Sequence, residues 1–126
     1  MRDGQAGYVV RMQIAMVGLG RMGSNMVRRL QRAGHECIAY DVNDAAVTAM
    51  KGEGVTGARS PQQVVAALAA PRHIWLMVPA AYVADTIARF EPLLSPGDTI
   101  IDGGNSWYPA DLHRAAPLAA TRLHYL

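Results

Sequence analysis

Six consecutive residues near the N-terminus carry glycine at their first, third and sixth positions. They are Gly18, Leu19, Gly20, Arg21, Met22 and Gly23. A short apolar run at 14–18 leads into them, and a segment with helical periodicity follows. In such a setting the first glycine permits a tight turn, the second lets backbone approach a phosphate, and the third lets helix and strand pack closely. The pattern predicts a loop that binds the pyrophosphate of a dinucleotide, with a purely structural glycine turn as the alternative.

Asp41 is the acidic residue that such a loop requires at the end of the next strand. It follows Gly18 by 23 residues, close to the spacing of about 20 expected for a carboxylate that binds the adenosine ribose. Its charge and that of Asp44 would repel a 2′-phosphate, and no Lys or Arg occupies positions 42–50. These residues predict NAD rather than NADP. The alternative is that Asp41 only closes the strand or the turn after it.

Asn105 is the candidate substrate-binding residue. It follows a predicted strand at 99–102 and two glycines that clear space beside it. Ligands of open parallel sheets bind at the carboxyl ends of the strands, and an amide both donates and accepts hydrogen bonds. Asn105 therefore suits a hydroxylated substrate, with a tight loop in which it bonds only backbone as the alternative.

The elements that position these residues alternate between strand and helix from Gln13 onward. Strands are expected at 14–18, 37–41, 74–78, 99–102 and 123–126. Helices are expected at 23–33, after a cap at Asn43, after Ser60 with Pro61 in its first position, at 82–94 and at 111–116. On the first helix, Met22 and Met26 belong to the expected apolar face. The alternation predicts an α/β fold, a Rossmann-type doubly wound parallel sheet with helices on both faces.

Composition bounds the class of protein. The chain has 126 residues, of which 51% are hydrophobic and 17% charged, and a net charge of +2. It can therefore build one core, and it has no basic excess that would indicate nucleic acid or an anionic membrane as partner. The apolar run at 74–84 is shorter than the roughly 20 residues of a membrane-spanning helix. A single cysteine, Cys37, fits a reducing cytoplasm, and four scattered histidines give no metal-ligand spacing.

The chain divides into two expected parts. Residues 1–12 match no later pattern and are expected to form a flexible leader, while residues 13–126 form one dinucleotide-binding domain. Because 123–126 has the pattern of a strand that is just beginning, the sheet is expected to be truncated at its C-terminus. We therefore expect the chain to be a fragment of a longer enzyme.

Together these motifs resemble the N-terminal domain of the decarboxylating 6-phosphogluconate dehydrogenases over almost all of residues 13–126. The resemblance covers the segments at 14–23, 25–26, 34–35, 40–41, 77–80 and 102–106. The most specific of them is Asp102-Gly103-Gly104-Asn105-Ser106. The related β-hydroxyacid dehydrogenases share the glycine loop but carry an Asp-x-Ser-Thr pattern at that point.

The resemblance implies oxidation of 6-phosphogluconate at C3, followed by decarboxylation to ribulose 5-phosphate. It implies that residues 18–23 hold the pyrophosphate and that Val78, Pro79 and Ala80 line the cofactor groove. It also implies that Asn105 lies near the nicotinamide and binds the phosphorylated sugar acid. NADP-using members carry an Asn-Arg pair after the second strand and a lysine within their Val-x-Ala motif. Here Val42 follows Asp41 and Pro79 replaces the lysine, which resembles the NAD-using bacterial branch.

The family's catalytic Lys and Glu, its Ser-Gly-Gly substrate loop and its helical dimerisation domain all lie beyond the matched region. Lys51 is the only lysine and matches no catalytic position. We therefore expect no catalytic residue in this chain, no activity of the chain alone, and a homo-oligomeric full-length enzyme. Two alternatives stay open: a domain of another β-hydroxyacid dehydrogenase, and a non-catalytic dinucleotide-binding module.

Overall fold

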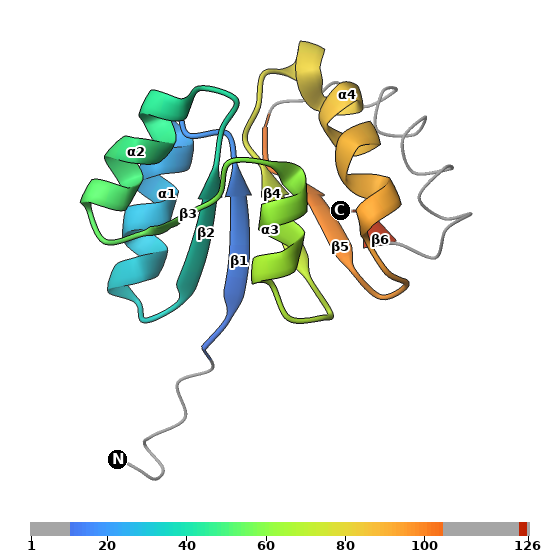
Figure 1. Cartoon of the computed structure of the whole chain (residues 1–126), viewed down its shortest axis with the longest axis horizontal. Coiled ribbons are helices and arrows are strands. Elements are labelled where there is room, and N and C mark those ends of the chain that lie inside the picture. The colour runs from blue at the N-terminus through green and yellow to red at the C-terminus, as the bar shows by residue number, and fades with distance from the viewer. Residues whose placement is uncertain (1–10, 105–123, 126) are drawn as a thin grey trace, which may run out of the picture.

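The computed structural model describes residues 11–104 and 124–125. Six strands within these residues form one fully parallel sheet in the order β3-β2-β1-β4-β5-β6 (Figure 1). The strands are β1 (Gln13–Val17), β2 (Glu36–Tyr40), β3 (Thr56–Gly57), β4 (His73–Leu76), β5 (Thr99–Asp102) and β6 (His124–Tyr125). The chain winds outward from β1 in one direction and then from β4 in the other. This is the strand order of a Rossmann fold and confirms the predicted doubly wound sheet.

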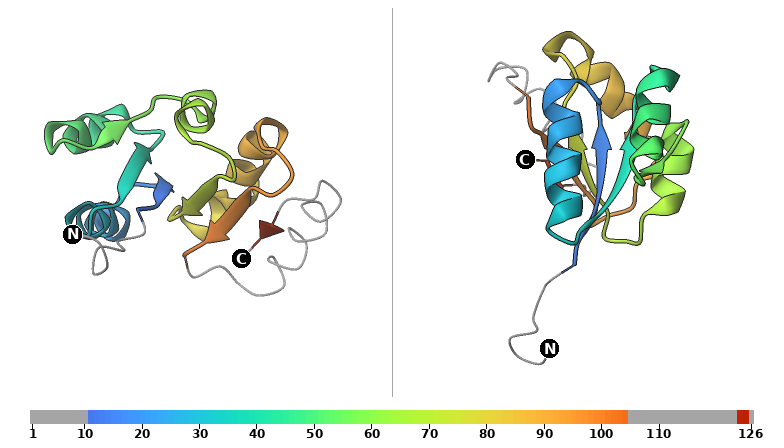
Figure 2. Two further views of the ribbon diagram at one scale, coloured as in Figure 1. Left: turned by 90° about the horizontal axis from the view of Figure 1, so that it is seen from below. Right: turned by 90° about the vertical axis from the view of Figure 1, so that its left-hand side faces the viewer.

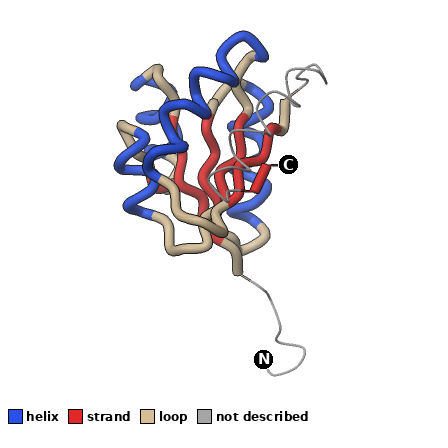
Figure 3. Tube along the Cα trace, turned by 90° about the vertical axis from the view of Figure 1, so that its right-hand side faces the viewer, coloured by secondary structure: helices blue, strands red, loops and turns tan. Residues whose placement is uncertain are grey.

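Helices connect these strands and cover both faces of the sheet. Those in the described residues are α1 (Arg21–Arg32), α2 (Asp44–Gly52), α3 (Pro61–Ala67), α4 (Ala80–Phe90) and the single 3₁₀ turn η1 (Glu91–Leu93). Figure 2 shows α1 and α3 on opposite sides of β1, and Figure 3 shows the strands enclosed by helices. The sheet is thus a buried central layer, as parallel sheets usually are.

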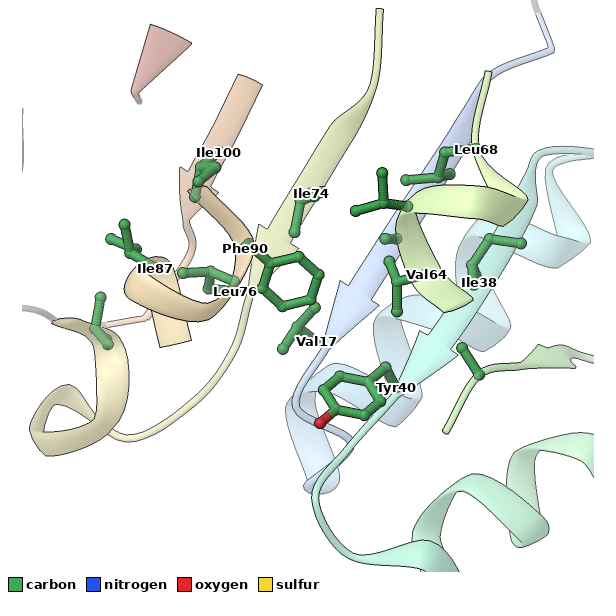
Figure 4. Packing of buried hydrophobic residues seen from close by; sticks show 14 residues of the cluster. Val17, Ile38, Tyr40, Val64, Leu68, Ile74, Leu76, Ile87, Phe90 and Ile100 are labelled. Atoms are coloured by element: carbon green, nitrogen blue, oxygen red, sulfur yellow. The ribbon is translucent and has the colours of Figure 1, made fainter. Parts of the chain in front are cut away.

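Alternate side chains of the central strands supply two separate cores. Met16 and Cys37 pack with α1 and α2 in one. Ile38 and Tyr40 pack with α3 and α4 in the other (Figure 4). There the rings of Tyr40 and Phe90 meet edge to face, with centroids 6.3 Å apart and planes at 75°. Burial on both faces explains why β1 and β2 are apolar at successive positions instead of alternating.

Two predicted helix starts are confirmed by their capping bonds. The Asn43 side chain accepts a hydrogen bond from the Ala45 amide at 3.0 Å. The Ser60 hydroxyl accepts one from the Gln63 amide at 3.1 Å, and the Gln63 side chain accepts one from the Arg59 amide at 2.8 Å. These bonds satisfy amides that the first turn of a helix otherwise leaves without a partner.

The boundaries of several elements differ from the predictions. β1 and β2 each end one residue early, because Gly18 already turns and Asp41 closes the turn after β2. β4 ends at Leu76 instead of 78. α4 begins at Ala80 instead of 82 and ends at Phe90, followed by η1. β3 was not predicted, since two residues are too few to show a periodicity.

The packing prediction for Met22 is wrong. Its side chain is 66% exposed, because α1 begins at Arg21 and its first turn projects beyond the end of β1. Val27, five residues further along the helix, is fully buried as expected. The helix predicted at 111–116 lies outside the described residues. The strand predicted at 123–126 corresponds to β6, which pairs with β5.

A buried ion pair ties the segment before β4 to the turn before β5. Asp98 is fully buried and accepts hydrogen bonds from the amides of Arg72 and Ser95 at 2.7 and 2.8 Å. The Arg72 guanidinium adds a third bond at 3.1 Å. Burial disfavours the charged form and is the largest single influence on Asp98. The two amides and the guanidinium outweigh it and hold the pKa of Asp98 below its ordinary value.

We expect Asp98→Asn to lower the free energy of unfolding by about 1.5 kcal/mol at pH 7, because hydrogen bonds to a charged acceptor are lost. A lowered folded pKa means that the carboxylate stabilises the fold above the unfolded pKa of about 3.9. That contribution is lost as the pH falls through the lowered folded pKa of Asp98, so the gap between the two proteins should shrink as the pH is taken below about 3.9. Urea unfolding across this range measures the difference. A gap between wild type and variant that stays constant with pH would contradict the assignment.

Candidate cofactor-binding site

The predicted glycine loop is the turn that joins β1 to α1. Gly18 has a φ of +103°, and its amide donates to the Tyr40 carbonyl at 2.9 Å. A Cβ at Gly18 would lie 2.6 Å from the carbonyl oxygen of Met77 on the neighbouring strand segment. A Cβ at Gly23 would overlap the carbonyl oxygen of Gly18. These two glycines therefore let α1 begin in close contact with the sheet.

Gly20 faces open space at the beginning of α1. A Cβ at Gly20 would meet no atom within 4 Å. As the N-cap it provides no side-chain acceptor, and the first turn of α1 contains no acidic residue. The Ser24 hydroxyl, near the start of α1, donates to the Leu19 carbonyl at 2.8 Å. The amides and positive dipole end of α1 therefore face a region with room for a diphosphate, so the residues present fit that group.

Asp41 braces the glycine turn. One of its oxygens, Oδ2, accepts from the Leu19 amide at 2.7 Å, and the other, Oδ1, accepts from the Asn43 amide at 2.9 Å. The second bond closes the turn between β2 and α2, as the simpler interpretation of Asp41 requires. A carboxylate has about four acceptor positions, so both oxygens can still accept from a ligand. Asp41 can thus hold the loop in shape and still accept hydrogen bonds from ribose hydroxyls.

A cavity of about 860 Å³ opens beside this turn. This volume is within the range of about 300–1,000 Å³ usual for small-molecule sites. Its walls come from the glycine turn, the ends of β2 and β4, and one face of α4. Besides residues of the glycine turn, the walls include Tyr40, Asp41, Val42, Pro61, Met77, Val78, Pro79, Tyr82, Asp85, Thr86, Arg89, Phe90 and Gly104. Met22, Val42 and Tyr82 are large apolar side chains that stay exposed at this cavity.

Most of the residues predicted for the site come together here. Val78 and Pro79 line the cavity, whereas Ala80 is exposed at the start of α4 and does not. Leu19 contributes its amide to Asp41, but its side chain is buried in the core and is not part of the wall. Asn105 lies outside the described residues, directly after Gly104 of the cavity wall.

The wall formed by α4 was missed by sequence reasoning. Tyr82, Asp85, Thr86 and Arg89 recur at helical spacing and all face the cavity. Asp85 and Arg89 form an ion pair at 3.3 Å along this face. These side chains are a mixture of polar, charged and aromatic types, as on an ordinary solvent-exposed helix face, so their sequence pattern does not indicate a site. The available signal was topological, because a helix that follows a strand next to β1 borders the crevice where the strand order reverses.

The segment that leads toward Asn105 is supported by Trp75. A Cβ at Gly103 would overlap the indole nitrogen of Trp75, so this glycine lets the ring pack against the backbone. The indole N–H donates to the sulfur of Met77 at 3.2 Å. The Gly104 amide donates to a carboxylate oxygen of Asp102 at 3.1 Å. The backbone after β5 is therefore held by two contacts: Trp75 of β4 packs against Gly103, and an Asx-type turn closes from Asp102 to Gly104.

The reactive residue types elsewhere have structural surroundings. Cys37 is buried in β2, and burial, with a smaller effect of the Glu36 charge, raises its pKa to about 11. It is therefore a protonated strand thiol at neutral pH. Lys51 is exposed on α2, with its stem against Gly57. Within the described residues, no three His, Cys, Asp or Glu side chains are grouped to hold a metal ion, and no helix could cross a membrane.

In doubly wound sheets, dinucleotides bind at the crevice where the winding changes direction, and the glycine turn and cavity lie at that crevice here. The chain is accordingly an NAD(P)-binding Rossmann domain. It belongs to the family described as the NAD binding domain of 6-phosphogluconate dehydrogenase, whose model matches residues 13–126. The family predicted from the motifs is thereby confirmed.

Curated relatives of the chain are dehydrogenases. The NAD(+)-dependent, decarboxylating 6-phosphogluconate dehydrogenase of Haloferax volcanii is 40% identical over 113 residues, which is 89% of this chain and 38% of that enzyme. The decarboxylating 6-phosphogluconate dehydrogenase of Homo sapiens is 39% identical over 113 residues, 85% of this chain and 23% of that enzyme. The chain thus spans well under half the length of these relatives. It represents the nucleotide-binding portion of an oxidoreductase family.

Solved structures share the fold. The 6-phosphogluconate dehydrogenase of Plasmodium falciparum, described with its cofactor NADP+, has a TM-score of 0.78 at 24% identity, over 93% of this chain and 26% of that one. The 3-hydroxyisobutyrate dehydrogenase of Mycobacterium tuberculosis has a TM-score of 0.82 at 24% identity, over 92% and 39%. At these identities the likeness concerns architecture. The fold is therefore common to dehydrogenases that differ in substrate.

Proposed function

We propose that this chain binds NAD as the nucleotide domain of a decarboxylating 6-phosphogluconate dehydrogenase. The observation that carries the proposal is Asp41, which is bonded to the glycine turn and faces the cavity with acceptor capacity left. Substrate and reaction are proposed from the family and from the Asp102 to Ser106 motif. The same motif favours this reaction over that of another β-hydroxyacid dehydrogenase.

The glycine turn supplies the phosphate contacts in this proposal. Backbone amides at Gly20 and Arg21 begin α1 beside the open space, where a helix N-terminus attracts negative charge. Leu19 is held in place through its amide by Asp41, which keeps the turn in one conformation. Preorganised amides avoid the entropy cost of ordering a loop on binding.

Asp41 selects NAD over NADP. A carboxylate accepts hydrogen bonds from both hydroxyls of the adenosine ribose, and its charge repels a phosphate at the 2′ position. Val42, which follows Asp41, is 78% exposed at the cavity and adds no cation there. The opening beside β2 thus offers acceptors and apolar surface to an unphosphorylated ribose.

The reacting end of the site lies toward β4 and β5. A bound NAD supplies a hydride acceptor for the oxidation. Val78, Pro79 and the Gly104 backbone form the wall there, and Asn105 is proposed to donate to and accept from the sugar acid. Proton transfer needs a base within hydrogen-bond reach of the substrate hydroxyl. Lys51, the one lysine, is exposed on α2, so we assign the base to the family's catalytic lysine outside the matched region.

A paired titration of the purified chain with NADH and NADPH, followed by nucleotide fluorescence, tests the proposal. We expect saturable binding of NADH and at least roughly tenfold weaker binding of NADPH, a difference of about 1.4 kcal/mol. A preference for NADPH would refute the role of Asp41 in selection. If neither nucleotide bound, the assignment of the cavity to a dinucleotide would be wrong for this chain.

A further inference from the structure

Arg59 lies at the level of Asp41 in the sheet, although 18 residues separate them in the sequence. β3 pairs in parallel with β2 through Ala39 and Gly57. The Ala58 amide then donates to the Ala39 carbonyl at 2.9 Å, which extends the pairing by one residue. The chain therefore leaves β3 beside the carboxyl end of β2. Pro61, two residues after Arg59, lines the same cavity as Asp41.

The guanidinium of Arg59 lies over the first turns of α2. It forms an ion pair with the Asp44 carboxylate at 3.4 Å and a hydrogen bond to the Thr48 hydroxyl at 3.4 Å. The side chains of Arg59 and Asp44 are 45% and 74% exposed, so water reaches both partners. An exposed pair of this kind contributes little to stability. The pair matters because it places the Arg59 guanidinium at the start of α2.

The backbone on both sides of this pair is fixed. The Arg59 amide donates to Gln63, and Ser60 caps α3, which holds the residue that carries the guanidinium. Asn43 caps α2 and is itself bonded to Asp41, which holds Asp44 next to the ribose-binding carboxylate. A 2′-phosphate on a ribose bound by Asp41 would lie near this start of α2, because Asp41 accepts a hydrogen bond from the amide of Asn43, the N-cap of α2. Arginine is the side chain best suited to bind it.

We infer that the ion pair with Asp44 prevents Arg59 from binding a 2′-phosphate. The Asp44–Arg59 ion pair is thus a second determinant of the choice between NAD and NADP. This inference rests on the proposed function, because it takes the ribose to lie at Asp41. In the wild type, Asp44 neutralises the guanidinium and adds its own repulsion. Without Asp44, Arg59 has no carboxylate partner and can bind a phosphate beside the 2′ position. The repulsion between the Asp44 carboxylate and that phosphate is removed as well.

Adenosine 5′-monophosphate and adenosine 2′,5′-bisphosphate are probes that differ only in the 2′-phosphate. Their dissociation constants, measured by NMR titration of the 126-residue chain, isolate this position from the rest of the dinucleotide. We expect Asp44→Asn to shift the ratio about fivefold or more toward the bisphosphate, the effect of a surface charge contact. The double variant Asp44→Asn with Arg59→Gln should lose most of that gain.

Glu53→Gln is the matched control. Glu53 lies at the other end of α2 and forms an exposed ion pair with Arg28 at 2.7 Å. Its replacement also removes one acidic charge and frees one arginine, but away from the cavity, so the ratio should not change. A ratio unchanged in Asp44→Asn would overturn the inference. So would an equal gain in the double variant, or failure of every variant to bind the bisphosphate.

The outcomes separate the inference from the proposed function. If NADH binds the wild type and the ratio of the two dissociation constants is the same with and without Asp44, the proposed function stands and the inference fails. If NADH does not bind but Asp44→Asn acquires Arg59-dependent binding of the bisphosphate, the placement of Arg59 stands and the dinucleotide assignment fails. If Arg59→Gln alone weakens binding of the bisphosphate fivefold, Arg59 already serves the phosphate and Asp44 does not withhold it.

Discussion

Gly23→Ala is expected to cost the chain about 3 kcal/mol of stability, at the upper end of the usual range for overpacking. The added Cβ would overlap the Gly18 carbonyl oxygen, which belongs to backbone and cannot rotate away. α1 must then move off the sheet and take its N-terminal amides with it. A displacement of about 1 Å of binding groups can cost on the order of 100-fold in function. We therefore expect NADH affinity to fall by about that factor.

Gly20→Ala separates binding from folding. The new Cβ meets no protein atom within 4 Å, and the φ of −67° at Gly20 suits alanine. The melting temperature should fall by only a few degrees, since alanine is a poorer N-cap than glycine, while NADH affinity falls about tenfold, because the methyl group occupies space needed by the phosphate. Gly52→Ala is the control, since its Cβ is also unobstructed and it lies at the end of α2.

Thermal unfolding and NADH titration of these three variants distinguish the two roles of glycine. The structural role at Gly23 requires that stability and binding fall together. The binding role at Gly20 requires that binding falls with little loss of stability. If Gly20→Ala bound NADH like the wild type, the diphosphate would lie elsewhere. If Gly23→Ala unfolded at the wild-type temperature, the close contact between α1 and the β1 turn would be wrong.

Asp41→Asn is expected to reduce NADH affinity about 10- to 100-fold, since hydrogen bonds to a charged acceptor are worth about 1.5–3 kcal/mol. NADPH affinity should fall less or rise, because a repulsive charge is removed from beside its phosphate. The asparagine can also keep only one of the two amide bonds, to Leu19 or Asn43, through its single oxygen. Some loss common to both nucleotides is therefore expected, and the ratio of the two affinities reports selection.

Asn43→Ala controls for loosening of the same turn. It removes the cap of α2, which should cost about 1 kcal/mol of stability, without changing any charge. The ratio of NADH to NADPH affinity should then remain that of the wild type. An Asp41→Asn variant with an unchanged ratio would show that Asp41 is only a turn-closing residue.

Local patterns in the sequence were sufficient for the parts of this site that depend on neighbouring residues. The glycines at 18, 20 and 23 imply a turn, an open position and a close contact, and each occurs as the motif requires. The caps at Asn43 and Ser60 were likewise predictable, because the acceptor side chain and the amides it serves are two or three residues apart.

The parts that were missed depend on residues far apart in the sequence. No cation occurs at 42–50, yet the pairing of β3 with β2 brings Arg59 to Asp44. Tyr82 and Arg89 belong to the cavity because α4 follows the strand beside β1, which the residues of α4 do not reveal. Met22 fits an apolar helical face by spacing but lies beyond the end of β1. Strand order had to be known before these assignments could be made.

The central place of β1 also affects the order in which the chain can fold. β1 is the first strand described, and Ala15 pairs with Ile38 on one side and with the much later Ile74 on the other. Gly18 packs against the Met77 carbonyl, which follows β4. During synthesis from the N-terminus, β1, α1 and β2 therefore emerge before the nucleotide turn has its second wall. A ligand that requires this wall cannot assist the earlier steps, and it stabilises the finished domain by slowing its unfolding.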